Sequence, residues 1–83
     1  MLYGPRYLTL RQALVGARLG AGLTQAVMAQ RMGRAQSFIS KVEIGERYVD
    51  VIDFVDWCQI TGVDGAQILA KLTSVGAVHT ERT

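Results

Sequence analysis

Four polar residues stand on the outward positions of a short helical pattern near the middle of the chain: Gln36, Ser37, Ser40 and Lys41. A glutamine amide can pair with adenine, a lysine can reach guanine or phosphate, and a serine hydroxyl can bond to either. The set supplies hydrogen-bond donors and positive charge but no general base. These residue types therefore indicate binding to the base edges of double-stranded DNA rather than catalysis.

Further candidates surround this polar face. Gln25 begins the preceding helical pattern, where a helix N-terminus can meet a phosphate. Arg34 and Arg47 flank the face and can hold the DNA backbone, so replacing Arg34 is expected to weaken binding to all sequences alike. Tyr48 and Tyr3 can touch phosphates or simply cover apolar surface.

The elements that must position these side chains are five short helices, and the chain shows no β pattern. Apolar spacing and glycines, with Thr9, Thr24, Asp50 and Asp64 as capping residues, predict helices at 10–19, 25–32, 36–43, 51–61 and 65–72. We expect three regions: an irregular N-terminal arm at 1–8, the folded domain at 9–72 and a flexible tail at 73–83. The predicted fold is all-α, a compact five-helix bundle.

The second and third predicted helices meet at Gly33, which favours a left-handed backbone. Ala29 is small, so the two helices can cross closely as a helix-turn-helix. Ile39 and Val42 are expected to anchor the third helix in the core. Its polar face then projects outward on a rod that fits the major groove of B-DNA, which is about 12 Å wide.

The charge is unevenly distributed along the 83 residues. Residues 1–42 carry six basic residues and no acid, whereas residues 43–83 carry seven acids and three basic residues. A hydrophobic fraction of 49% with 19% charged residues is typical of a single folded domain. The compact molecule is therefore expected to have a basic surface that attracts a polyanion, unless these are ordinary solvated charges.

Several other classes of protein are disfavoured. Cys58 is the single cysteine, which excludes an intramolecular disulfide and a cysteine-based zinc site and suits a reducing, cytoplasmic setting. No apolar run approaches the roughly 20 residues of a membrane helix, and nothing resembles a signal peptide. His79 is expected to be solvated in the tail. We predict no catalytic residues, no metal, no cofactor and no small-molecule effector, and hence no enzyme.

The stretch "LTQAVMAQRMGRAQSFISKVEIGER", residues 23–47, resembles the helix-turn-helix of the Cro and phage-repressor type, the xenobiotic-response-element (XRE) family. The matching positions are Leu23-Thr24-Gln25, Ala29, Gly33, the run from Ile39 to Glu43, and Gly45-Glu46-Arg47. The resemblance covers about residues 10–70. It implies a lambda-repressor-like DNA-binding domain in which helices 2 and 3 form the helix-turn-helix.

The resemblance also implies roles for single residues. Gln25 matches a glutamine that contacts phosphate and supports the recognition helix, and the four polar residues of the third helix match base-reading positions. Arg18 and Glu43 match a charged pair that ties the first helix to the end of the third. This pair would be structural and partly buried, so that losing one partner should cost more stability than the pair contributes.

Two positions depart from the family pattern. Ala35 replaces the usual capping hydroxyl or proline, and Ser37 is an alternative cap one or two residues later. Phe38 stands where a small polar residue is common. We expect it to pack on the domain, with contact to a thymine methyl group as the alternative.

The resemblance further implies a homodimer on a pseudo-palindromic site, with half-sites about 34 Å apart. The fourth helix and the following segment are the expected interface, because Ile52, Val63 and Ile68 are more apolar than a solvent face requires. Trp57 is expected in the core. The leading hypothesis is a sequence-specific, repressor-like transcriptional regulator; the alternative is a protein-binding adaptor or antitoxin-like module with the same fold.

Overall fold

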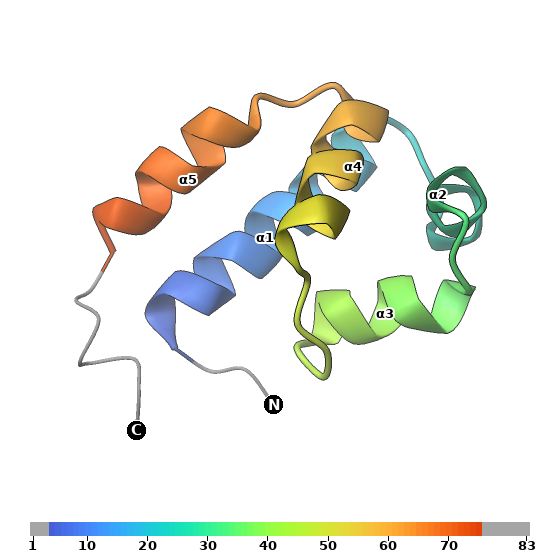
Figure 1. Cartoon of the computed structure of the whole chain (residues 1–83), viewed down its shortest axis with the longest axis horizontal. Coiled ribbons are helices and arrows are strands. Elements are labelled where there is room, and N and C mark those ends of the chain that lie inside the picture. Colours follow the sequence, from blue (N-terminus) through green and yellow to red (C-terminus); the bar gives the residue numbers. More distant parts are fainter. Residues whose placement is uncertain (1–3, 76–83) are drawn as a thin grey trace.

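A computed structural model describes residues 4–75, and within them the chain forms five α-helices and no strand (Figure 1). The helices are α1 (Pro5–Gly20), α2 (Gln25–Met32), α3 (Gln36–Ile44), α4 (Val51–Thr61) and α5 (Gly65–Thr73). The predicted all-α, five-helix fold is confirmed. Tyr3 and His79, for which expectations were stated above, lie outside the described residues.

The first helix begins earlier than the sequence predicted. α1 starts at Pro5, so the expected irregular arm is wrong for residues 5–8. Proline suits the first helical position because its fixed φ is already helical and its missing N–H would have no partner there. Thr9 does not cap the helix; its hydroxyl donates to the Pro5 carbonyl one turn earlier, at 3.0 Å.

The remaining helix ends follow the predicted capping residues closely. Thr24, Asp50 and Asp64 each accept a backbone N–H in the first turn of the helix that follows. α3 is the exception, because it begins directly after Ala35 without a side-chain cap, and Ser37 lies inside it. α3 and α5 each run one residue beyond the predicted end, so that Thr73 is helical rather than part of a tail.

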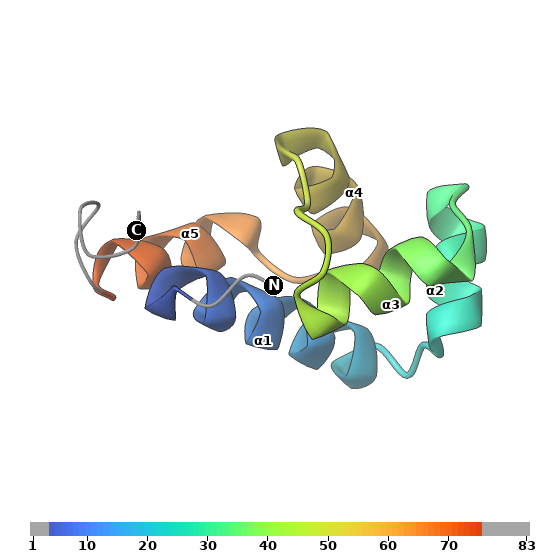
Figure 2. The ribbon, with the colours of Figure 1, turned by 90° about the horizontal axis from the view of Figure 1, so that it is seen from below.

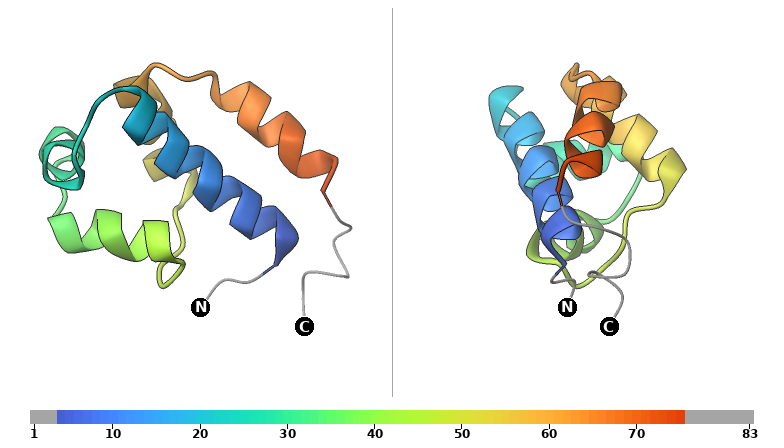
Figure 3. Two further views of the ribbon diagram at one scale, coloured as in Figure 1. Left: turned by 180° about the vertical axis from the view of Figure 1, so that it is seen from behind. Right: turned by 90° about the vertical axis from the view of Figure 1, so that its left-hand side faces the viewer.

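The helices are arranged around a central crossing of α1 and α4. Figure 3 shows α1 and α5 side by side in both views. In Figure 1, α2 is seen nearly along its axis while α3 lies across the view, so these two helices cross at a steep angle. Seen from below in Figure 2, α3 lies along one face with no other described helix in front of it.

One hydrophobic core joins all five helices. Its buried residues are Leu14, Ala17, Met28, Ala29, Phe38, Ile39, Val42, Phe54, Trp57, Cys58 and Ile68. Met28, Ile39, Val42 and Trp57 are fully enclosed, so the predicted core positions of Ile39, Val42 and Trp57 are confirmed. The indole N–H of Trp57 donates to the Leu14 carbonyl at 3.0 Å, which satisfies the one polar group of this side chain and joins α4 to α1.

Two features are missing from residues 4–75. None of their helices combines the length and the hydropathy that crossing a bilayer requires. The same residues contain no group of three histidine, cysteine or acidic side chains close enough to hold a metal ion.

Candidate nucleic-acid interface

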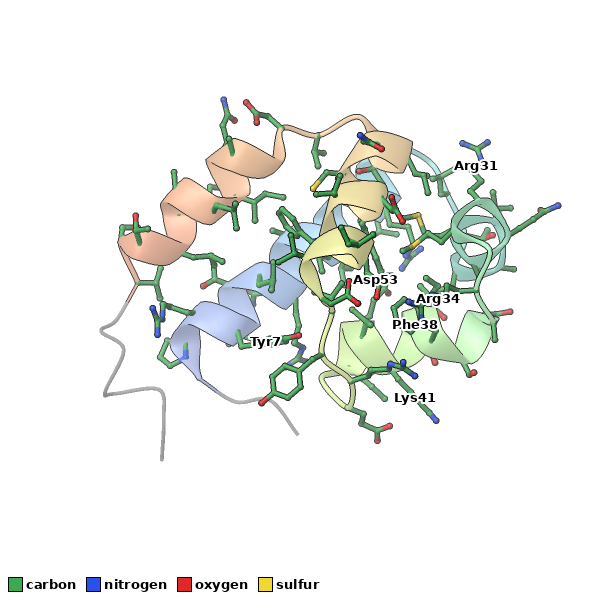
Figure 4. The ribbon with its side chains drawn as sticks, in the orientation of Figure 1. Tyr7, Arg31, Arg34, Phe38, Lys41 and Asp53 are labelled. Carbon is green, nitrogen blue, oxygen red and sulfur yellow. The ribbon has the colours of Figure 1, made fainter. Side chains whose placement is uncertain are left out.

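The four polar residues predicted on the third helix share one face of α3. Gln36, Ser37 and Lys41 are exposed, and Ser40 is half-buried with its hydroxyl 3.4 Å from the Ser37 carbonyl. Figure 4 shows Lys41 pointing away from the body of the molecule below α3. Ile44, at the end of the helix, is also exposed. The structure therefore presents this edge of α3 to solvent and not to the core.

The opposite face of α3 is fixed by packing and by a tight turn. Ile39 and Val42 point into the core. The turn from α2 passes through Gly33, whose φ of 68° lies in the left-handed region, and the Arg34 N–H then donates to the Ala29 carbonyl at 2.9 Å. Ala29 is buried at the crossing. A short turn and a small contact residue thus set the angle at which α3 leaves α2.

Arg18 and Glu43 form the ion pair that the family resemblance implies. Arg18 Nε lies 2.6 Å from Glu43 Oε2, and Nη2 donates to Oε1 at 3.0 Å. The side chains are 11% and 6% exposed. Arg18 Nη1 donates in addition to the Leu23 carbonyl at 2.8 Å. The hydrogen bond that Arg18 donates to the Glu43 carboxylate raises the pKa of Arg18 against the opposing effect of burial, so the guanidinium is charged.

Gln25 joins the same network from the first turn of α2. Its amide Nε2 donates to Glu43 Oε1 at 3.0 Å. Glu43 therefore accepts from α1 and from α2 while it stands near the end of α3. Gln25 is half-buried, and one of its two amide hydrogens serves this internal bond.

Arg11 is a residue of this region that the sequence analysis missed. Its Nε donates to the Glu43 carbonyl at 3.3 Å, near the C-terminal end of α3. The guanidinium group lies over Gly45, where an added Cβ would stand 2.7 Å from Arg11 Cζ. The available signal was its spacing from Arg18, because residues seven apart lie on the same face of a helix.

A second cluster surrounds Phe38 in the first turn of α3. The ring is only 5% exposed, so the prediction that it packs on the domain is confirmed, and a side chain so enclosed does not favour the alternative contact with a thymine methyl. Arg34 Cζ lies 4.1 Å and Arg47 Cζ 4.9 Å from the ring centroid. Arg34 also pairs with Asp53, with Nη2 to Oδ1 at 2.7 Å.

Asp53 is the second residue that the sequence analysis missed. It lies in the first turn of α4, where its own N–H donates to the capping Asp50 Oδ1 at 2.7 Å. An acid in the first turn of a helix is common because it complements the helix dipole. Nothing in the local sequence therefore marks Asp53 as the partner of Arg34.

Arg47 and Tyr48 follow α3 and are both exposed. The Tyr48 ring stands edge-on to Tyr7, with centroids 5.2 Å apart. Tyr7 in turn holds this loop, because its phenolic oxygen accepts the Val49 N–H at 2.9 Å. Burial raises the pKa of Tyr7. The loop after α3 is thus tied to α1 by Tyr7, while Arg47 and Tyr48 remain exposed.

Comparison with known proteins agrees with this geometry. A family model described as a helix-turn-helix domain matches residues 9–70. No curated protein sequence matches the chain. Among solved structures, an XRE-family like protein from Pseudomonas syringae pv. tomato str. DC3000 is 48% identical, with 83% of this chain and 84% of that chain covered and a TM-score of 0.76.

A more distant structure shares the fold. The clp gene regulator ClgR from Corynebacterium glutamicum is 22% identical and superposes with a TM-score of 0.72. That match covers 83% of this chain and 73% of the other, and a second structure of ClgR covers 87% and 92% with the same TM-score. At this identity the likeness shows the arrangement of the helices alone.

Proposed function

Because this chain belongs to the helix-turn-helix family of the XRE type, we propose that it recognises specific sequences in double-stranded DNA and regulates transcription by occupying them. At the coarser level the family membership supports a DNA-binding transcriptional regulator. The proposal adds sequence specificity, the contact residues, a repressor-like action in which the bound protein blocks polymerase, and a dimeric state.

The observation that carries the proposal is the two-sided character of α3. Its apolar side is locked in the core by Ile39 and Val42, while the side that bears Gln36, Ser37 and Lys41 is exposed. A rigid helix of this size with polar side chains at one edge fits the major groove, where base pairs present distinct patterns of donors and acceptors.

We assign base contacts to the polar side chains of α3, with Gln36 pairing with adenine and Lys41 reaching guanine or phosphate. Ser37 and Ser40 complete the reading edge. Among the predicted backbone contacts, Gln25 stands in the first turn of α2, where exposed N–H groups favour an anion. Arg47 and Tyr48 are exposed just beyond α3. Arg34 differs from these residues because it has a carboxylate partner within the chain, Asp53.

The proposed dimer uses the exposed apolar face at the start of α4. Val51 and Ile52 are 75% and 68% exposed, and Val55 lies one turn further along the same helix. One of the three residues predicted for the interface needs correction, because Ile68 is buried in the core of its own chain. Val63 packs partly against that core and is half-buried.

The decisive experiment selects preferred sequences from random duplex DNA and then measures affinity for the preferred site and for an unrelated duplex. We expect a clear preference, a steep fall in affinity as salt rises, and a loss of preference in Gln36→Ala. Gln67→Ala is the matched control, because Gln67 is an exposed glutamine on α5, away from α3.

Failure of this experiment has a definite meaning. If the protein selects no sequence and its affinity for DNA is weak at low salt, the proposal is wrong. The fold would then serve the alternative function, an adaptor or antitoxin-like module that holds another protein.

A further inference from the structure

The start of α3 is held from outside the helix and not by a capping side chain. Ala35 occupies the N-cap position and its methyl group offers no acceptor. A helix start without such a cap leaves its first N–H groups without a side-chain partner and its direction weakly fixed. Gln36 and Ser37 stand in this first turn, so another contact must determine where they point.

That contact is made through Phe38, whose ring contacts two guanidinium groups. Arg34 comes just before α3 and Arg47 just after it, and both approach the ring within the roughly 6 Å range of a cation–π interaction. The ring is buried, so these contacts are partly shielded from water and are stronger than they would be at an exposed site. Phe38 therefore holds the first turn of α3 against its neighbours.

Asp53 fixes the position of Arg34. Arg34 Nη2 donates to both carboxylate oxygens of Asp53, at 2.7 and 2.9 Å. The Asp53 side chain is 9% exposed and the Arg34 side chain 35%. Figure 4 shows Asp53, Arg34 and Phe38 next to one another between α4 and α3. The three side chains form a connection from the first turn of α4 to the first turn of α3.

This pairing argues against the phosphate contact that the sequence predicted for Arg34. Moving its guanidinium to a phosphate would leave the Asp53 carboxylate nearly buried and uncompensated, which is strongly unfavourable. Arg47 differs because its side chain is exposed, although its guanidinium also lies 4.9 Å from the Phe38 ring centroid. The two arginines touch the same ring from opposite ends of the helix, but only Arg34 is bound to a buried carboxylate in the structure.

We infer that Arg34 and Asp53 are positioning residues for sequence recognition: the pair holds Phe38 and thereby aims Gln36 and Ser37, without itself binding DNA phosphate. The inference rests on the proposed function. It assigns the specificity of the interface partly to α4, a helix that need not touch the bases.

The test compares four variants of the full chain: Arg34→Gln, Asp53→Asn, the double variant and Arg47→Gln. For each, the dissociation constant is measured over a salt series on the selected site and on an unrelated duplex. The double variant leaves no unpaired buried charge, so it stays informative if a single change impairs folding. Fluorescence of the buried Trp57 and circular dichroism establish that each variant is folded at the assay temperature.

We expect Arg34→Gln, Asp53→Asn and the double variant to lose roughly tenfold in the ratio of specific to unrelated affinity, the size of one good base contact. For these three variants, the slope of the logarithm of the binding constant against the logarithm of the salt concentration should equal that of the unchanged protein. Arg47→Gln removes only the more distant of the two ring contacts, so it should cost less of the ratio, and it should lower the slope by about 0.9, the value for one phosphate. Asp53→Asn also removes a negative charge, but this effect strengthens binding to both duplexes and cancels in the ratio.

Contrary results separate the two proposals. The inference is wrong if the double variant keeps the ratio of specific to unrelated affinity. It is also wrong if Arg34→Gln lowers the slope of the salt dependence by about 0.9, which would indicate that Arg34 contacts a phosphate. Tighter binding of Asp53→Asn to both duplexes with an unchanged ratio does the same. An unchanged protein without any preferred sequence overturns the proposed function and the inference with it.

Discussion

The phenolic oxygen of Tyr7 accepts a hydrogen bond from the backbone N–H of Val49 at 2.9 Å, across 42 positions of the chain. Tyr7 belongs to the first turn of α1, and Val49 to the loop that leads from α3 into α4. The contact therefore fixes the loop that carries Arg47 and Tyr48, two of the proposed backbone contacts.

Replacing Tyr7 by phenylalanine should leave the half-buried Val49 N–H without this acceptor. We expect a loss of about 1 kcal/mol in the free energy of unfolding, the usual size for one hydrogen bond. Urea denaturation followed by Trp57 fluorescence measures it. Tyr48→Phe is the control, because that hydroxyl belongs to a side chain that is largely exposed; equal losses in the two variants would contradict the role given to Tyr7.

Removing the charge of Glu43 should destabilise the protein severely. Glu43→Gln leaves Arg18 buried without its counter-ion, for which we expect a loss of about 3–5 kcal/mol, a large part of the stability of a small domain. Arg18→Met should show a similar loss, and the double change should lose clearly less than the sum of the two. Additive losses in equilibrium denaturation would show that the pair is not coupled.

Alanine at Gly45 should be less tolerated than alanine at Gly62. Both glycines have a left-handed φ, 85° and 79°, so both substitutions strain the backbone by about 1–2 kcal/mol. Only at Gly45 does the new methyl group displace the Arg11 guanidinium from the end of α3. The difference in melting temperature between the two variants should therefore disappear when Arg11 is also changed to alanine.

The thiol of Cys58 predicts a loss of stability at alkaline pH. Burial raises its pKa above the value of 9.0 expected in the unfolded chain. Below pH 9 the thiol is neutral in both states and this contribution to stability is fully present. As the pH rises toward the folded-state pKa, only the unfolded chain loses its proton and stability falls. When unfolding is measured at pH 8 and at pH 10, the fall in the free energy of unfolding between the two should be smaller for Cys58→Ala than for the unchanged protein.

The exposed face of α4 predicts the oligomeric state. Ile52→Glu should shift the mass measured by light scattering from dimer to monomer and weaken binding to a two-half-site duplex, while binding to one half-site stays the same. Leu19→Glu is the matched control, because Leu19 is 62% exposed on α1 against 68% for Ile52. A dimer that survives Ile52→Glu but not Leu19→Glu would move the interface to α1.

The sequence predicted the parts of the fold that local rules govern. Thr24, Asp50 and Asp64 cap their helices as predicted because capping depends on a few adjacent residues. The start of α1 was misplaced because Pro5 and Thr9 are both acceptable near a helix start, and only the structure shows Thr9 bonding back to Pro5. Competing local signals of this kind cannot be ranked from the sequence alone.

The tertiary pairings around α3 were harder to predict. Arg34 and Asp53 stand 19 positions apart, and only the docking of α4 brings them together. Ile68 was assigned to an interface because its apolar character fits a core or a dimer equally well, and the packing of α5 places it in the core. The outward residues of α3 were found because helical spacing alone separates them from Ile39 and Val42.

The bonds that meet at Glu43 have a practical consequence for protein engineering. A designer who transplants only the two-helix unit, residues 24–45, into another scaffold leaves behind Arg18 and Arg11, which together hold the side chain and the carbonyl of Glu43. The graft would carry a carboxylate that has lost its arginine partner and keeps only the amide of Gln25. The smallest portable form of the proposed reading helix is therefore a three-helix piece that keeps α1.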